Sequence, residues 1–178
     1  MKRITLLLFC LLAGYTVSRA QKSFPAGYAG IWKGDLYMYT AGVKNVGKIP
    51  MSLTIKATDS TNQWIWIISY LPPGKTPDQR NYELIVTDSA RGKYTIDEKN
   101  GILIDARMVG NVLATRFAVG ESLLLITYKL EGDSIVFEVT SGPVNTPHET
   151  GNQPENDVPP VIVYAITGYQ KAVLVKDK

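Results

Sequence analysis

Residues 93–119, KYTIDEKNGILIDARMVGNVLATRFAV, decide the fold of this chain. Two tight-turn signals, Asn100-Gly101 and Gly110-Asn111, divide this stretch into three short runs rich in β-branched and aromatic residues. Asn-Gly suits a two-residue type I′ loop, and glycine in the first loop position suits a type II′ loop. The stretch therefore predicts two consecutive β-hairpins, with strands at about 93–97, 102–108 and 112–119.

The same period-two pattern continues on both sides of this stretch, and no segment after residue 20 has a helical stripe. We expect further strands at about 28–40, 49–57, 63–71, 81–87, 122–130, 134–140, 161–166 and 169–176, and a proline-rich loop at 141–160. Short turns join most of these strands, which is typical of an antiparallel meander. A meander of this length usually closes to remove its open edges, so the sequence predicts an all-β barrel of eight to ten strands.

The tight turns also predict which residues face one another. Two-residue loops at Gly110-Asn111 and Asn100-Gly101 would place Asp105 opposite Arg116 and Tyr94 opposite Arg107. One interpretation of this cluster is a solvated outer face with cross-strand charge pairs. The other places Arg107 and Arg116 inside the barrel, as anchors for a ligand carboxylate.

A third turn favours the solvated interpretation. A loop at Gly132-Asp133 would pair Tyr128 with Phe137 and make one face of that hairpin wholly apolar. That face must be core, which leaves Lys129 and Glu138 on the outer side.

Residues 1–20 resemble a secretory signal peptide, with Lys2 and Arg3 before an apolar run and Ser18-Arg19-Ala20 as the cleavage site. Its removal takes away three of the 19 basic residues and the single cysteine, which leaves equal numbers of basic and acidic residues. This balance gives no reason to expect nucleic acid as a partner, and no later apolar run is long enough for a transmembrane helix. We expect residues 21–178 to be one exported barrel domain, periplasmic or extracellular.

The residues needed for common catalytic chemistry are scarce. The single histidine, His148, lies in the expected proline-rich loop. A zinc site there would lack further histidine or cysteine ligands, and a haem ligand would have to reach inward from this loop. There is no Gly-x-Ser-x-Gly elbow, and most acidic residues fall at turns. The sequence therefore predicts a protein that is not an enzyme and needs no cofactor or metal.

Aromatic residues concentrate in the first strands and form the clearest sign of a ligand site. Each of them could be ordinary core, but together they suit the lining of a cavity for a small apolar or amphipathic molecule. We expect Trp32, Trp64, Trp66 and Tyr70 to lie near this cavity or its base.

Gly30-Ile31-Trp32 resembles the Gly-x-Trp signature of the lipocalins, exported barrels that bind small hydrophobic ligands. The resemblance implies a lipocalin-like or calycin-like barrel in which Trp32 closes the base beneath a basic residue, here Lys171 or Lys176. The family's Thr-Asp-Tyr motif is reduced to Thr127-Tyr128, and its disulfide cannot form.

Two other classes fit part of the pattern. One is a structural or carbohydrate-contacting β-sandwich of the cell envelope, which exposed coplanar aromatics on one face would favour. The other is an outer-membrane barrel, although most apolar segments are shorter than nine residues. Neither the ligand's identity nor the oligomeric state follows from the sequence.

Overall fold

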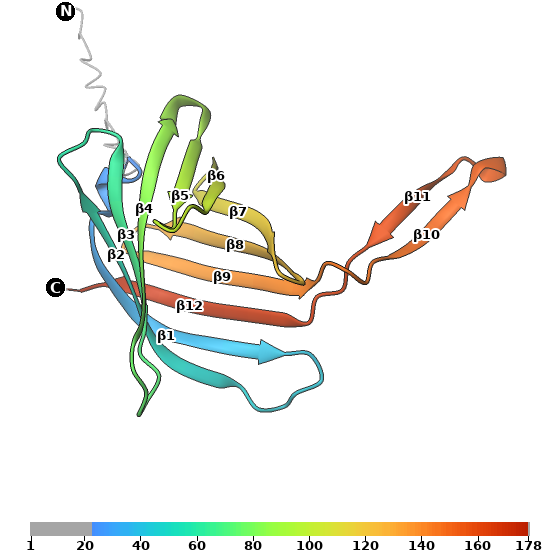
Figure 1. Cartoon of the computed structure of the whole chain (residues 1–178), viewed down its shortest axis with the longest axis horizontal. Helices are drawn as coiled ribbons and strands as arrows, with labels where there is room; N and C mark the ends of the chain where they lie inside the picture. The colour runs from blue at the N-terminus through green and yellow to red at the C-terminus, as the bar shows by residue number, and fades with distance from the viewer. Residues whose placement is uncertain (1–22, 178) are drawn as a thin grey trace, which may run out of the picture.

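Ten antiparallel strands form a closed barrel in the computed structural model, which describes residues 23–177 (Figure 1). The strands are β1 (Gly30–Thr40), β2 (Gly47–Ala57), β3 (Gln63–Tyr70), β4 (Asp78–Asp88), β5 (Lys93–Asp97), β6 (Leu103–Val109), β7 (Val112–Val119), β8 (Ser122–Glu131), β9 (Ser134–Pro143) and β12 (Gly168–Lys176). The helical elements of this part are the short 3₁₀ turns η1 (Ala26–Tyr28), η2 (Ser89–Arg91) and η3 (Pro154–Asn156). None of them has the length and hydropathy to cross a membrane. The expected signal peptide lies outside the described residues.

The predicted closure of the meander is confirmed. Strands β1 to β9 follow one another around the barrel, and β12 completes the ring by pairing with both β9 and β1. Each barrel strand has two neighbours, so the barrel itself has no free sheet edge of the kind that promotes aggregation. The β-sandwich considered as an alternative is therefore wrong as a description of the fold.

Side chains alternate between an apolar interior and an exterior that carries charged residues among exposed apolar ones. On β1, Trp32 and Leu36 are buried, whereas Lys33 lies outside and pairs with Asp177 at 2.6 Å. A second outer pair joins Lys129 of β8 to Glu131. Outer-membrane barrels have the opposite arrangement, a polar lumen inside an apolar band, so the polarity of this barrel does not favour that alternative.

Two of the three predicted hairpin registers are seen. Tyr128 pairs with Phe137 across the Gly132-Asp133 turn, and both side chains are buried. Met108 pairs with Leu113 across the Gly110-Asn111 turn, where Gly110 has a φ of 61°. The β6–β7 ladder stops at the pair formed by Arg107 and Ala114, so the expected pairing of Asp105 with Arg116 is not formed.

The register predicted for β5 and β6 is wrong by one residue. Tyr94 lies opposite Ala106 rather than Arg107, and Ile96 lies opposite Ile104. A two-residue loop would have set two inward apolar side chains against outward charged ones. Because a one-residue shift moves every side chain of a strand to the other face, matching the two apolar faces requires the longer loop.

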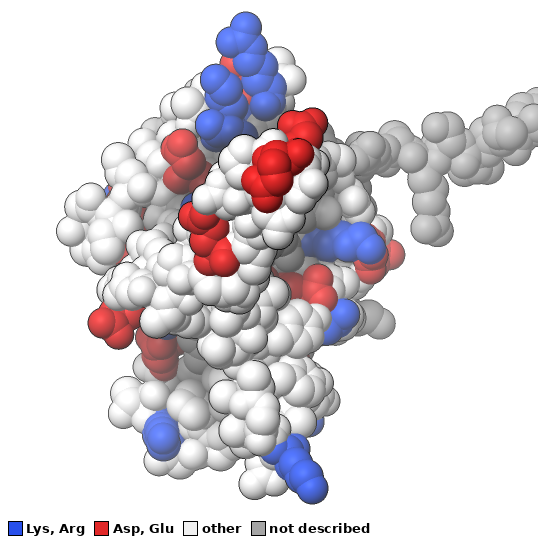
Figure 2. Space-filling view, turned by 90° about the vertical axis from the view of Figure 1, so that its right-hand side faces the viewer, with Lys and Arg blue, Asp and Glu red and all other residues white. Residues whose placement is uncertain are grey.

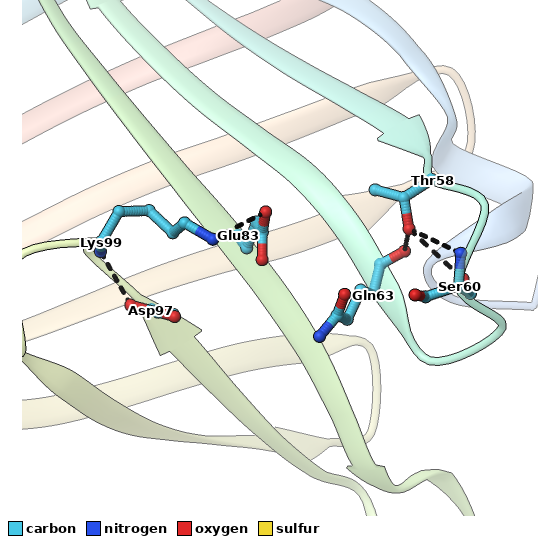
Figure 3. Close-up of polar contacts among 6 residues, drawn as sticks. All are labelled: Thr58, Ser60, Gln63, Glu83, Asp97 and Lys99. Carbon is cyan, nitrogen blue, oxygen red and sulfur yellow. Dashed lines mark hydrogen bonds and ion pairs between the residues drawn. The ribbon is translucent and has the colours of Figure 1, made fainter.

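Polar contacts hold this longer loop in place (Figure 3). Lys99 adopts a left-handed φ of 62°, and its backbone N–H donates to the Asp97 carboxylate at 2.7 Å. The Lys99 ammonium group reaches Glu83 on β4, with Nζ 3.0 Å from Oε1. These contacts fix the position of the intervening Glu98, whose N–H donates to the carbonyl of Ile102.

A similar polar network closes the turn between β2 and β3, also visible in Figure 3. The Thr58 hydroxyl donates to the carbonyl of Gln63 at 2.8 Å and accepts the N–H of Ser60 at 3.2 Å. The side chain thus supplies hydrogen bonds that the short connection between the strands leaves unmade.

The proline-rich segment expected to be a loop forms a separate hairpin. Strands β10 (His148–Gln153) and β11 (Val158–Val163) pair only with each other and project away from the barrel (Figure 1). Residues 161–163 of the strand expected at 161–166 therefore belong to this hairpin and not to the barrel, and residues 164–166 are not in a strand. Both strands of a two-stranded hairpin are edges, so Pro159 and Pro160 are tolerated in β11.

The projecting hairpin carries acidic side chains but no basic ones. Glu149, Glu155 and Asp157 lie within it, whereas no lysine or arginine occurs between Lys129 and Lys171. Figure 2 views the molecule from the side toward which the hairpin projects, and acidic groups lie in the middle of that face with basic groups mainly toward its margins. Every hairpin residue except Val163 is exposed.

Gly34 tests the closure between β1 and β12. A Cβ atom at this position would lie 2.3 Å from the backbone oxygen of Val173, which cannot move aside without disturbing the ladder. We expect Gly34→Ala to lower the free energy of unfolding by about 1–3 kcal/mol in urea denaturation. Ser52→Ala, on the outer face of β2, should change it by less than about 0.5 kcal/mol. Equal stability of Gly34→Ala and the parent would contradict the close approach of the two strands.

Candidate ligand-binding cavity

A cavity of about 390 Å³ occupies one end of the barrel interior. Every barrel strand contributes to its wall. The lining residues are Leu36, Met38, Ile49, Trp66, Ile68, Tyr70, Pro72, Asp78, Arg80, Tyr82, Ile96, Glu98, Ile104, Thr115, Phe117, Leu124, Ile126, Tyr128, Phe137, Val139 and Gln170. Asp78 and Arg80 are exposed while lining the cavity, so it opens to solvent at their end. Its volume lies within the range of roughly 300–1,000 Å³ typical of small-molecule sites.

Three aromatic rings form the floor of the cavity. Trp66 meets Tyr128 edge-on with ring centroids 5.1 Å apart, and Tyr128 lies at the same distance from Phe137. All three side chains are buried. Such contacts between rings stabilise beyond the area they bury, which makes this floor a rigid surface.

Two polar atoms of the floor differ in what surrounds them. The Trp66 indole nitrogen is buried without a hydrogen-bond partner among residues 23–177. It lies close enough to the Tyr128 hydroxyl to influence that group but outside hydrogen-bonding geometry. Burial raises the pKa of Tyr128 far above its ordinary value, so its hydroxyl stays protonated. The floor thus presents neutral groups only, apolar except for the Tyr128 phenol and the Trp66 indole N–H.

The opposite end of the barrel is closed by the N-terminal segment. Phe24 lies with its ring 6.2 Å from Trp66 and 5.2 Å from Tyr94. The Trp32 indole N–H donates to the carbonyl of Tyr28 at 2.9 Å, which satisfies the one polar group of a fully buried side chain. These rings fill the base and leave the cavity a single polar mouth.

A basic residue covers Trp32, as the Gly-x-Trp resemblance implies. The Lys176 ammonium group lies 5.7 Å from the centre of the Trp32 ring. Gly30 makes room for this side chain, because a Cβ atom there would come within 2.5 Å of the Lys176 Cε. Lys171, the other candidate, instead pairs with Glu138 on the outer face at 3.2 Å.

The four aromatic residues expected near the cavity or its base all point into the barrel. Trp66 and Tyr70 line the cavity. Trp32 closes the base, and Trp64 packs against the core near it without reaching the cavity wall. The period-two pattern of β3 correctly placed Trp64, Trp66 and Tyr70 on one face.

Arg107 and Arg116 are not brought to the cavity. Both are exposed on the outer face, where Arg107 lies 3.7 Å from Asp105. Neighbouring inward positions of β6 and β7 hold Ala106 and Thr115, so the alternation of the strands turns the arginines outward. The interpretation of this cluster as an interior anchor is therefore not supported, and the solvated interpretation agrees with the structure.

Sequence reasoning missed the charged residues of the mouth. Asp78 and Arg80 lie on β4, which begins three residues before the start expected at Asn81. Extending the inward positions Leu84 and Tyr82 backward by twos would have found both. Glu98 reaches the mouth through the long β5–β6 loop, which the Asn-Gly signal did not predict.

A second group of aromatic side chains lies on the outer face, where β1 meets β12. The rings of Tyr39 and Tyr169 stack at 5.8 Å with 28° between their planes. The Tyr169 hydroxyl donates to the Glu138 carboxylate at 2.5 Å, and this hydrogen bond raises the pKa of Tyr169 to about 12. Tyr37, two residues away on the same face, is also exposed.

His148 begins β10 and is exposed on the projecting hairpin, away from the cavity wall. Within residues 23–177 the structure contains no group of three or more histidine or carboxylate side chains placed to hold a metal ion.

No protein-family model matches the sequence, and comparison with curated proteins finds no significant relative. The structure is an antiparallel ten-strand barrel, which is consistent with calycin-like proteins. Because neither comparison gives a match, the chain is not assigned to the lipocalins.

The contact between Lys176 and Trp32 can be tested through stability. Lys176→Met keeps most of the aliphatic volume but removes the charge above the ring, so we expect a loss of about 0.5–1 kcal/mol in the free energy of unfolding. Lys176→Arg keeps a cation over the ring and should retain most of that stability. Urea denaturation of the three proteins measures both values, and a Met variant as stable as the parent would exclude the contact as a source of stability.

Proposed function

We propose that this protein binds one small apolar or amphipathic molecule inside its barrel and does not catalyse a reaction. The observation that carries the proposal is the cavity of about 390 Å³, which has an aromatic floor and opens at one end. Barrels of comparable strand number hold a single small ligand in this position. The closed base leaves one direction of access, through the mouth between Tyr70, Arg80 and Glu98.

The wall chemistry supports an apolar body for the ligand. Above the floor, the half-buried side chains of Met38, Ile49, Phe117, Leu124 and Ile126 point inward around the cavity. Apolar surface that remains wet in the empty protein favours a ligand that covers it, by about 25 cal/mol for each Å² removed from water. The polar side chains gather at the mouth, where a polar end of the ligand would remain near water.

The arrangement of Gly30, Trp32 and Lys176 supports a lipocalin-like relation in particular, since it joins the sequence signature to a basic cover at the barrel base. We also infer that the protein works outside the cytoplasm, in the periplasm or the extracellular space, because residues 1–20 have the pattern of a signal peptide. Mass measurement of the protein isolated from its host should then show a chain that begins at Gln21.

The outer tyrosines favour a second candidate function, contact with carbohydrate. Stacked and exposed rings beside carboxylate and ammonium groups can pack against the apolar face of a sugar while the polar neighbours bind its hydroxyls. Tyr39, Tyr169, Glu138 and Lys171 provide such a combination. These side chains lie on the outer wall of the barrel and do not line the cavity, so the interior site remains the main proposal.

A cavity-filling substitution tests the main proposal. Ile126→Trp adds bulk to the cavity wall, and we expect it to weaken binding of a fluorescent apolar probe at least tenfold, as followed by titration. Leu125→Trp is the matched control, because the adjacent side chain points outward and is 41% exposed. Its affinity should equal that of the parent. Equal binding by all three proteins would place the probe outside the barrel and remove the support for an interior site.

The carbohydrate alternative makes a different prediction. Tyr39→Ala should reduce the retardation of the protein in gels that contain a soluble polysaccharide, because it removes one of the two stacked rings. Tyr164→Ala removes a tyrosine of similar exposure away from the stack and should leave the mobility unchanged. If the parent protein is not retarded by any polysaccharide tested, the outer tyrosines serve only as a cross-strand pair.

A further inference from the structure

The inward face of β4 changes character along the cavity. Leu84, near the base, is fully buried, whereas Tyr82, Arg80 and Asp78 follow at successive inward positions toward the mouth. A charged side chain on the inward face of a barrel strand needs a partner there or access to water. Arg80 has both, because its side chain is 48% exposed and Asp78 lies beside it.

Arg80 is held in place but only weakly paired. Its guanidinium carbon lies 5.2 Å from the centre of the Tyr70 ring, and its one ion pair, to Asp78, is long at 3.4 Å. A guanidinium group has five N–H donors in a planar fork. Within residues 23–177, Asp78 accepts one of them, and the Tyr82 hydroxyl also interacts with the guanidinium group. Arg80 is also the only lysine or arginine among the residues of that part that line the cavity.

The neighbouring phenols add donors on the same side of the mouth. Burial raises the pKa of Tyr70, and burial together with the negative charge of Glu98 raises the pKa of Tyr82. Both hydroxyls therefore stay protonated, and that of Tyr82 is engaged with the Glu98 carboxylate. Arg80 and the Tyr70 hydroxyl thus provide donors at the upper end of the cavity, beside the carboxylates of Asp78 and Glu98, and an oxyanion is a group that would accept from them.

We propose that the ligand is a single-headed apolar carboxylate whose body fills the cavity and whose carboxylate binds Arg80 at the mouth. This inference rests on the proposed binding function and narrows it to one head-group chemistry. Asp78 and Glu98 limit the choice further, because their charges oppose a head group that carries two negative charges. Asp78 also competes with the ligand for Arg80, so binding requires Arg80 to exchange a long ion pair for a bidentate one.

Matched single-chain probes test the head group. Decanoate, decanol and decylamine share one apolar chain and differ only at the end, and their affinities for the purified protein can be compared by calorimetry below their aggregation concentrations. We expect decanoate to bind at least tenfold more tightly than decanol, as charge-assisted hydrogen bonds in a half-buried site allow. Decylamine should bind more weakly than decanoate if Arg80 rather than the carboxylates of Asp78 and Glu98 governs the choice of head group.

Variants of the mouth then assign the preference to Arg80. Arg80→Gln should reduce the preference for decanoate over decanol to less than about threefold while leaving decanol binding unchanged, and Arg80→Lys should retain part of it. Asp78→Asn should tighten decanoate binding, because it frees the guanidinium. Arg107→Gln is the matched control, since Arg107 also pairs with a carboxylate two residues away but on the outer face.

The outcomes separate this inference from the function on which it rests. If decanol binds as tightly as decanoate, or if decylamine binds best, the carboxylate proposal is wrong while the interior binding site stands. If decanoate is preferred but Arg80→Gln keeps the preference, Arg80 is not the anchor. If none of the three probes binds to the parent protein, the interior binding site itself loses its support.

Discussion

A single constraint governs this barrel: each strand must turn its apolar set inward, and it can do so in only one register. The β5–β6 hairpin shows how strongly this constraint acts. A two-residue loop at Asn100-Gly101 would satisfy local turn preference, yet the chain adopts a longer loop with Lys99 in a left-handed conformation. The cost of that conformation is small beside the burial of Tyr94 and Ile96 in matching registers. Core packing therefore overrides turn chemistry where the two disagree.

Much of the fold follows from the sequence for the same reason. Period-two alternation predicted the barrel strands and their inward residues, and glycines at 110 and 132 fixed two registers that the structure confirms. The projecting hairpin was not predicted, because its residues are almost all exposed and its sequence has no alternation that marks a buried face. Its prolines exclude a central strand but not an edge strand. The hydrophobic pattern indicates strands through their buried face, which this hairpin lacks, and its pairing depends on the turn at η3, where Asp157 adopts a left-handed conformation.

The candidate site likewise has a part that the sequence predicted and a part that it did not. Part of the aromatic lining was predictable, since Trp66 of the floor and Tyr70 of the mouth belong to a strand with aromatic residues at alternate positions. The charged residues of the mouth were not, because Asp78 and Arg80 interrupt the apolar pattern and thus resembled the end of a strand. Inward charges are a poor fit to a packed core, but they are compatible with an opening where water or a ligand head group meets them. Departures from the alternation at strand ends therefore carry information about function, which a reading based on core residues alone discards.

The two ends of the interior have opposite requirements, and this opposition gives the cavity a direction. At the base, the rings of Phe24, Tyr28 and Trp32 pack together and the Trp32 indole N–H is satisfied by the carbonyl of Tyr28, so the inner end of the interior carries no charged group among the described residues that line it. At the mouth, Arg80 holds donors that the protein does not fully use. A molecule with one apolar and one polar end can satisfy both ends in one orientation only, since reversal would bury its head against the aromatic floor and leave its apolar end in water. Orientation would thus follow from desolvation, with the contact to Arg80 adding selectivity among head groups.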